Sequence, residues 1–131
     1  MPIPVEPGVL SVYVKNAATA TDTPVYVPWK NCQLSYAYSI CVDACSATSA
    51  ATTINLELNA ASGTVMQGIT VAAGATSVGT VDEATVSNQA ACENLSSDDA
   101  ARDVVNVTID GPTDADGAFM VYMYFESYYG E

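Results

Sequence analysis

The sequence predicts an all-β protein, a single antiparallel β-sandwich or jelly-roll-like domain of about eight strands with at most one short helix. Short segments rich in Val, Ile, Thr and Tyr alternate apolar with polar residues, which is typical of half-buried strands. Turns containing Gly, Asp or Pro separate these segments throughout the chain. Of the 131 residues, 50% are hydrophobic, so one domain can bury a sizeable core.

The composition excludes several classes of function. The chain carries 15 acidic and 3 basic residues and a net charge of −12, so phosphate backbones and anionic membrane surfaces repel it. It contains no histidine, which removes His-based general base, triad and zinc chemistry. No apolar run approaches the ~20 residues of a membrane helix, and no secretory signal pattern is evident. We therefore expect neither a nucleic-acid partner nor a membrane partner.

The first eight residues contain three prolines and predict an extended N-terminal arm. Proline fixes φ, lacks a backbone donor and biases the preceding residue towards extended geometry. We place the arm at residues 1–8 and the single β-sandwich domain at residues 9–131. A frayed terminus is the alternative for the arm.

The strands follow in order from residue 10. Leu10, Val12 and Val14 share one face of the first strand, and a second apolar segment covers residues 25–29 after a Thr/Asp/Pro turn. The clearest strand signal covers residues 31–43, where strict alternation predicts a half-buried strand. One parity of that segment consists of Cys32, Leu34, Tyr36, Tyr38, Ile40 and Val42, and the other of Gln33, Ser35, Ala37, Ser39, Cys41 and Asp43.

The second half of the chain continues the pattern. Small residues predict a loop over residues 44–53, and Gly-bearing turns are expected at residues 60–63 and 72–74. The expected strands cover residues 54–58, 65–71, 76–86, 105–109 and 119–126. Gly68 and Gly79 interrupt two of them.

One short helix is plausible near residue 97. Ser96 or Ser97 can cap it, Asp98 and Asp99 fall in its first turn, and Arg102 lies near its end. This order of residues suits the helix dipole.

The last strand lacks a polar face. Phe119, Val121, Met123 and Phe125 share one parity of this strand. A strand with water on one side should alternate apolar with polar residues. Either the strand is central and covered on both faces, or its tyrosine face meets another chain, because Tyr and Met are enriched at interfaces. The interface residues expected here are Met120, Tyr122, Tyr124, Tyr128 and Tyr129.

Four cysteines, Cys32, Cys41, Cys45 and Cys92, leave free thiols and a disulfide both open. Cys41 and Cys45 share a face, but four residues of extended strand span ~13 Å. That is too far for a disulfide unless the strand ends in a turn there. Zinc sites favour paired C-x-x-C spacing, which the chain lacks.

Asp110, Asp114 and Asp116 form a weak calcium candidate. They lack the ordered spacing and terminal Glu of an EF-hand loop, and Asp-Gly pairs are also good turn formers. Nothing brings two carboxylates together beside a sugar platform, as a glycosidase needs. We expect no catalytic residue, no metal and no cofactor, and hence no enzyme.

Six segments of the predicted strands carry a resemblance to a known family: residues 28–34, 54–59, 63–71, 75–81, 104–111 and 117–125. In their style and strand order they resemble the small head decoration (capsid cement) proteins of tailed bacteriophages, which have a β-sandwich or jelly-roll fold. The likeness extends over about residues 25–126, and the chain departs from it in its cysteines and in residues 92–102.

The resemblance implies a trimer on the outer surface of the phage head that bridges capsomers, with the major capsid protein as its partner. The arm would reach a neighbouring subunit through Pro2, Ile3, Pro4 and Val5. A tail or fibre component is the alternative within the virion. An alternative of another class is a carbohydrate-binding β-sandwich module that uses Trp29 and surface tyrosines.

Overall fold

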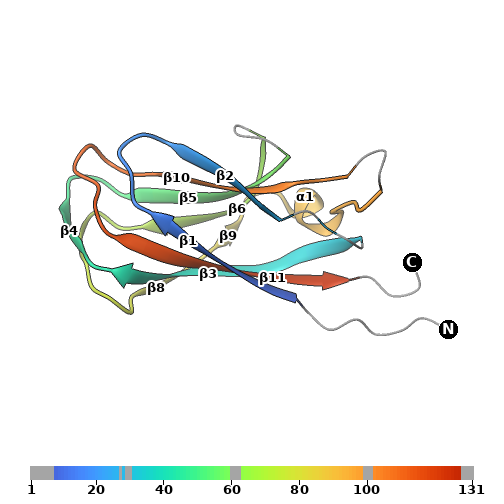
Figure 1. Ribbon diagram of the computed structural model, residues 1–131, viewed down its shortest axis with the longest axis horizontal. Coiled ribbons are helices and arrows are strands. Elements are labelled where there is room, and N and C mark those ends of the chain that lie inside the picture. Colours follow the sequence, from blue (N-terminus) through green and yellow to red (C-terminus); the bar gives the residue numbers. More distant parts are fainter. Residues whose placement is uncertain (1–7, 27, 29–30, 60–62, 99–101, 128–131) are drawn as a thin grey trace.

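The computed structural model describes residues 8–26, 28, 31–59, 63–98 and 102–127, and it confirms the all-β class. Two antiparallel sheets pack face to face, and a small two-stranded sheet closes one end (Figure 1). The described strands are β1 (Gly8–Lys15), β2 (Thr21–Tyr26), β3 (Cys32–Asp43), β4 (Cys45–Thr48), β5 (Thr52–Leu58), β6 (Thr64–Val71), β7 (Gly74–Thr76), β8 (Val81–Glu83), β9 (Thr85–Val86), β10 (Val105–Asp110) and β11 (Ala118–Ser127), and the helix is α1 (Gln89–Glu93).

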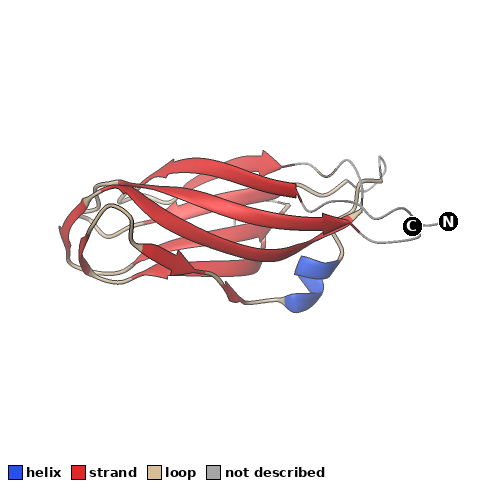
Figure 2. Ribbon diagram, turned by 90° about the horizontal axis from the view of Figure 1, so that it is seen from below, coloured by secondary structure: helices blue, strands red, loops and turns tan. Residues whose placement is uncertain are grey.

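Each main sheet mixes strands from both ends of the chain. The first has the order β1-β11-β3-β8, and the second has the order β2-β10-β5-β6-β9. Figure 2 views the sandwich from the side of the first sheet. Strands β1 and β2 are consecutive in sequence but lie at the edges of different sheets, so the chain crosses between the layers at residues 16–20. Segments β4 and β7 form the separate two-stranded sheet.

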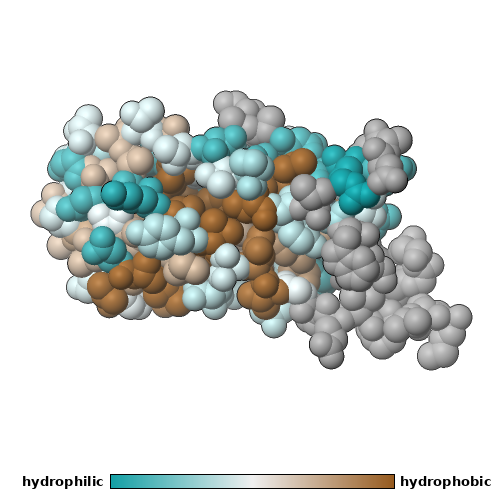
Figure 3. Space-filling model, viewed as in Figure 1, coloured by the Kyte–Doolittle hydropathy of each residue, from teal (hydrophilic) through white to brown (hydrophobic). Residues whose placement is uncertain are grey.

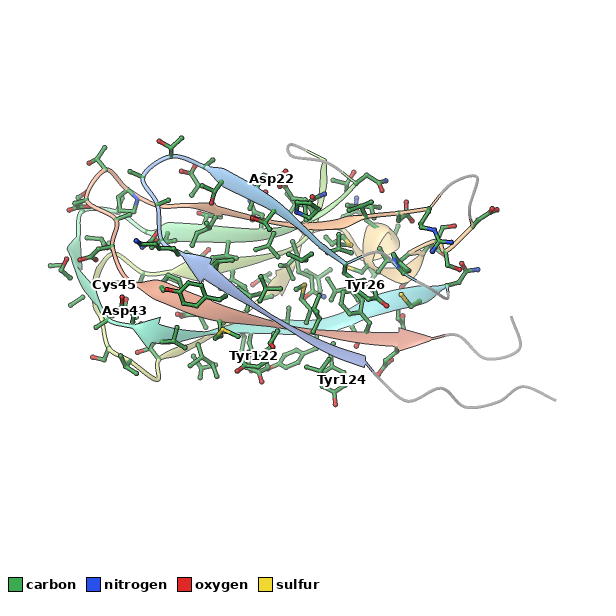
Figure 4. The ribbon with its side chains drawn as sticks, in the orientation of Figure 1. Asp22, Tyr26, Asp43, Cys45, Tyr122 and Tyr124 are labelled. Carbon is green, nitrogen blue, oxygen red and sulfur yellow. The ribbon has the colours of Figure 1, made fainter. Side chains whose placement is uncertain are left out.

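The core lies between the inner faces of the two sheets. Tyr26 of β2 reaches across it, and its ring stacks on Phe125 of β11 with centroids 4.3 Å apart. Figure 4 shows Tyr26 in the space between the layers. The bulkiest core side chains are fully buried, as hydrophobic burial favours. They include Ile54, Leu56, Ile69, Val105, Val107, Ile109, Phe119, Val121 and Met123.

The strand predicted over residues 31–43 exists, but its alternation is broken by a β-bulge at Ser35. Leu34 pairs with Phe125 and Tyr36 with Tyr124, so Ser35 is the extra residue, and its Oγ donates to the carbonyl of Tyr124 at 3.1 Å. A one-residue bulge moves the side chains that follow it to the other face of the sheet, here as far as a second register shift at Val42. After Leu34 the core-facing residues are therefore the small ones, Ala37, Ser39 and Cys41, while Tyr36, Tyr38 and Ile40 turn outward.

The helix prediction is wrong in position. The helix α1 begins earlier, where Asn88 caps it by accepting from the Ala91 amide at 3.0 Å. The described residues after it form a loop. The amide of Ser96 donates to Asp103 Oδ2 at 2.7 Å, and the amide of Asp103 donates to the Ser96 carbonyl at 2.9 Å. The Ser96 hydroxyl, the expected helix cap, accepts instead from the Asp98 amide at 3.1 Å within this loop.

The structure also contains four short strands that the sequence pattern did not predict as separate strands. Strand β4 falls inside the predicted loop 44–53, and β7, β8 and β9 divide the stretch predicted around residues 76–86. Their length explains why periodicity alone missed them, because strands of two to four residues are too short to show a clear alternation. Gly68 does not interrupt β6, which runs through it and pairs it with Asn55. Gly8 belongs to β1 and not to the arm, while residues 1–7 lie outside the described residues.

The side of the sandwich between the two edge strands exposes apolar side chains. Leu10 and Val12 of β1 and Val25 of β2 are only partly buried against the core. Figure 3 shows apolar residues forming a band across this side. In the parts of the chain that the structure describes, no helix has the length and apolar character to span a membrane.

Candidate interaction surface

The outer face of the β1-β11-β3-β8 sheet gathers tyrosines from three strands in register. We call it the tyrosine face. Its residues form three cross-strand rows: Val9, Tyr124 and Tyr36; Ser11, Tyr122, Tyr38 and Glu83; and Tyr13, Met120, Ile40 and Val81. In Figure 4, Tyr122 and Tyr124 project from β11 away from the other sheet.

Strand β11 supplies the centre of this face, because both its odd-numbered and its even-numbered residues are apolar or aromatic as far as Phe125. Its odd-numbered residues, such as Phe119 and Val121, are buried in the core, so the even-numbered ones must face outward. The strand is central in its sheet, as one of the two sequence-based alternatives has it. Its outer face is nevertheless not buried within the chain: Tyr124 is 39% exposed, and Met120 and Tyr122 are half-buried.

Direct contacts order the rings of this face. Tyr38 stacks on Tyr122 with centroids 5.1 Å apart and planes at 16°, and Tyr36 contacts Tyr38 at 5.5 Å with planes at 40°. The Tyr36 hydroxyl donates to Glu83 Oε1 at 2.7 Å. Tyr36, Tyr38 and Tyr122 therefore form a connected group of rings, and a binding partner need not immobilise these three one by one.

The tyrosine face is almost uncharged. Glu83, at the β8 edge, is the one charged residue in its three rows. The hydrogen bond to Glu83, more than desolvation, raises the pKa of the Tyr36 hydroxyl above its ordinary value. Tyr36 therefore remains a neutral donor at neutral pH. Such a surface can bind another protein through apolar ring contacts and hydroxyl hydrogen bonds.

The sequence-based interface prediction overlaps this face in part. Met120, Tyr122 and Tyr124 lie on it, whereas Tyr13, Tyr36, Tyr38 and Ile40 were not selected from the sequence. The signal for the β3 residues was hidden by the bulge at Ser35. The other predicted interface residues lie outside the described residues: Pro2, Ile3, Pro4, Val5, Tyr128 and Tyr129.

Two of the three aspartates of the weak calcium candidate accept hydrogen bonds within the fold. Asp114 accepts from the Ser49 amide at 3.1 and 3.0 Å and from its hydroxyl at 3.1 Å. Asp116 accepts from the Ser46 amide at 2.8 Å and from the Ser46 hydroxyl. Asp110 ends β10 and is exposed. Asp114 and Asp116 thus tie the turn before β11 to the β4 segment. Among the described residues, no group of three or more side chains could hold a metal ion.

The four cysteines are buried free thiols. Burial, the largest cause, raises the pKa of Cys32 to about 11 and also raises those of Cys45 and Cys92. These thiols therefore stay protonated at neutral pH, which keeps them unreactive while the fold is closed.

Fold and surface together define a class: a β-sandwich domain with an aromatic sheet face whose three rows contain a single charged residue, Glu83. No protein-family model matches the sequence, and no curated protein matches it significantly. Among solved structures, the chain is similar to a protein from the work reported as "Bacillus endospore appendages form a novel family of disulfide-linked pili". That similarity has a TM-score of 0.46 and 17% identity, covering 98% of this chain and 92% of that chain. A similarity at this level establishes no shared function.

Proposed function

We propose that the protein is a non-enzymatic structural subunit that packs through its tyrosine face onto a neighbouring protein in a large assembly. The observation that carries this proposal is the contrast between that face and the rest of the chain. The protein has a net charge of −12, yet the three rows of this face contain only one charged residue, Glu83; Lys15 and Glu126 lie on the same side of the sheet, just beyond the rows. Three rings on this face remain substantially exposed, with Tyr13 at 59%, Tyr36 at 42% and Tyr124 at 39%.

The assembly that we propose is the head of a tailed bacteriophage. The protein would be a decoration subunit, a trimer on the outer surface that bridges capsomers by binding the major capsid protein. The resemblance of residues 25–126 to such proteins supports this assignment. So does the charge: acidic side chains suit an outer surface, where they keep particles apart, and are poorly suited to contact packaged DNA.

The chemistry of the side chains supports a role without catalysis. The chain has no histidine. The carboxylates of Asp114 and Asp116 accept hydrogen bonds from the backbone of the β4 segment, so they hold the fold together instead of pairing as an acid and a base.

The test is a mass measurement of the purified protein, alone and mixed with phage shells that lack a decoration protein. We expect either a stable trimer or a monomer that co-sediments with shells in a fixed ratio. The decorated shells should also tolerate more heat, because a ligand that binds only the assembled shell stabilises it by mass action.

Two outcomes would overturn the capsid assignment. A protein that ignores shells but binds tail or fibre assemblies belongs to the tail. A monomer that ignores both and retains affinity for glycans as an isolated domain is a carbohydrate-binding module, its exposed tyrosine rings stacking on sugars.

A further inference from the structure

We propose that Cys41 and Cys45 are a disulfide-forming pair, and that under oxidising conditions they join the end of β3 to the start of β4. This inference is independent of the proposed function. It concerns the end of the sandwich where the two-stranded β4-β7 sheet meets the turn before β11, at the end that Figure 1 labels β4 and Figure 4 labels Cys45.

The backbone removes the obstacle that extended geometry would impose. Strand β3 ends at Asp43 and β4 begins at Cys45, and the two strands belong to different sheets, so the chain changes direction at Ala44. The Sγ atom of Cys41 lies 3.2 Å from the carbonyl oxygen of Asp43, on the bend itself. The spacing of four residues therefore does not correspond to the ~13 Å of a continuous strand.

Both cysteines lie beside Thr76. The Cys41 thiol lies 3.8 Å from the Thr76 carbonyl oxygen, and Cys45 is the direct partner of Thr76 in the β4-β7 pairing. The two thiols are also close enough that Cys41 helps to raise the pKa of Cys45, after the larger effect of burial. The shared neighbour and the effect of one thiol on the other place the two side chains next to each other, as a disulfide, with its Cβ atoms within about 4.5 Å, requires.

The packing around Cys41 and Cys45 is compatible with a disulfide bond between them. Cys41 and Cys45 are 1% and 6% exposed. A Cβ on Gly117 would lie 2.6 Å from Cys45 Sγ, so the site is closely packed. Bond formation shortens the distance between the sulfurs and demands no additional room. Access requires local opening of β4, which only two register pairs hold to β7.

The other cysteines lack this arrangement. The Cys92 thiol donates to the Met66 carbonyl at 3.4 Å, and Cys32 lies at the opposite end of β3 from Cys41. We expect both to remain thiols when the pair oxidises.

Oxidation proceeds by thiol–disulfide exchange with a small disulfide such as oxidised glutathione. One cysteine, as its thiolate, attacks a glutathione sulfur and breaks the glutathione disulfide, which forms a mixed disulfide and releases one glutathione thiolate. The second cysteine thiolate attacks the protein sulfur of that mixed disulfide and releases the second glutathione. The protein pair loses two electrons, the glutathione disulfide gains them, and the two thiol protons pass to the released thiolates.

The experiment incubates the native protein with excess oxidised glutathione, then denatures it and alkylates the remaining thiols. Intact mass should show two alkylated cysteines per chain. A protease that cleaves before aspartate separates Cys41 from Cys45 at Asp43, and the two peptides should stay joined until a reductant is added. The oxidised protein should unfold at a midpoint a few degrees above that of the reduced protein.

Cys32 shares the 22–42 peptide with Cys41, so a Cys32→Ala variant makes the assignment unique. Fragmentation of the joined wild-type peptides provides the same assignment if that variant does not fold. Alkylation of all four cysteines after prolonged oxidation would overturn the proposal. So would a link that involves Cys32 or Cys92.

Discussion

The ring of Tyr38 in β3 stacks on the ring of Tyr122 in β11, with centroids 5.1 Å apart and planes at 16°. The two residues are direct cross-strand partners in the middle row of the tyrosine face. Their contact requires the bulge at Ser35, because without it Tyr38 would point into the core. The local irregularity of one strand therefore creates the surface on which the proposed function depends.

A double-mutant cycle should detect this contact. Tyr38→Leu and Tyr122→Leu, alone and combined, should show a coupling of about 0.5–1.5 kcal/mol in the free energy of unfolding, beyond the loss of buried area. Urea denaturation measures it. A matched cycle on Tyr13 and Tyr38, which lie on β1 and β3 with β11 between them, should show coupling near zero. Equal coupling in both cycles would contradict a specific stack.

Charges placed on the tyrosine face should abolish assembly without unfolding the domain. Tyr122→Glu with Tyr124→Glu adds two charges to a surface that is only partly buried, so circular dichroism should stay that of the wild type. The control is Thr23→Glu with Thr70→Glu, which adds the same charge at exposed positions of the other sheet. Co-sedimentation with the partner assembly should disappear only in the tyrosine variant. Normal assembly of that variant would remove this face from the mechanism.

The bulge can be tested by placing a charge at one position that it turns towards the core and at one that it turns towards solvent. Ala37→Asp places a charge at a fully buried position and should cost more than about 3 kcal/mol of stability. Tyr36→Asp alters a position that is 42% exposed and should leave the domain folded. Thermal unfolding of the two variants separates the alternatives. A stable Ala37 variant beside an unfolded Tyr36 variant would indicate unbroken alternation.

The Tyr36–Glu83 hydrogen bond predicts a pH dependence at high pH. Since the pKa of Tyr36 is raised in the folded state, its contribution to stability is fully present below the unfolded tyrosine pKa of about 10. It is lost as the pH rises through the folded value. Tyrosine ionisation followed by ultraviolet absorbance should show one group titrating at lower pH in Glu83→Gln. Tyr36→Phe identifies that group, and an identical titration curve in Glu83→Gln would contradict the bond.

The hydrogen bonds to Asp114 predict that stability depends on pH in the opposite sense, at low pH. Hydrogen bonds from Ser49, chiefly from its backbone amide, lower the pKa of the Asp114 carboxyl. Its contribution is therefore present above the unfolded aspartate pKa of about 3.9 and is lost as the pH falls through the folded value. Asp114→Ala should lower the melting temperature at pH 7 and differ little from the wild type under strongly acidic conditions. A difference that is the same at every pH would show that the carboxylate charge is not responsible.

Local pattern was sufficient for the long strands. Period-two alternation identified β1, β5, β6 and β10, because each presents one apolar face to the core over at least six residues, and β11 was identified as a run of apolar and aromatic residues. The absence of a polar face on β11 indicated either a strand covered on both faces or an interface; Met120, Tyr122 and Tyr124 lie on the outer face of the sheet, and their contact with another chain stays a prediction.

The helix and the short strands required information from distant residues. Ser96 has the side chain of a good helix cap, yet its backbone amide donates to the Asp103 carboxylate, and this bond holds Ser96 in a loop. Strand β4 exists because it pairs with β7, about thirty residues later, and its four residues carry no periodicity of their own.

By itself, the sequence determined that this chain forms an acidic, all-β domain without histidine chemistry, since composition and alternation are properties of neighbouring residues. Tertiary structure alone decided which tyrosines meet, because the bulge at Ser35 depends on the register between β3 and β11. It also decided that Cys41 and Cys45 both lie beside Thr76, because the bend at Ala44 depends on β4 leaving the sheet that contains β3. Register and sheet exchange are set by contacts between segments far apart in the chain, and no local pattern encodes them.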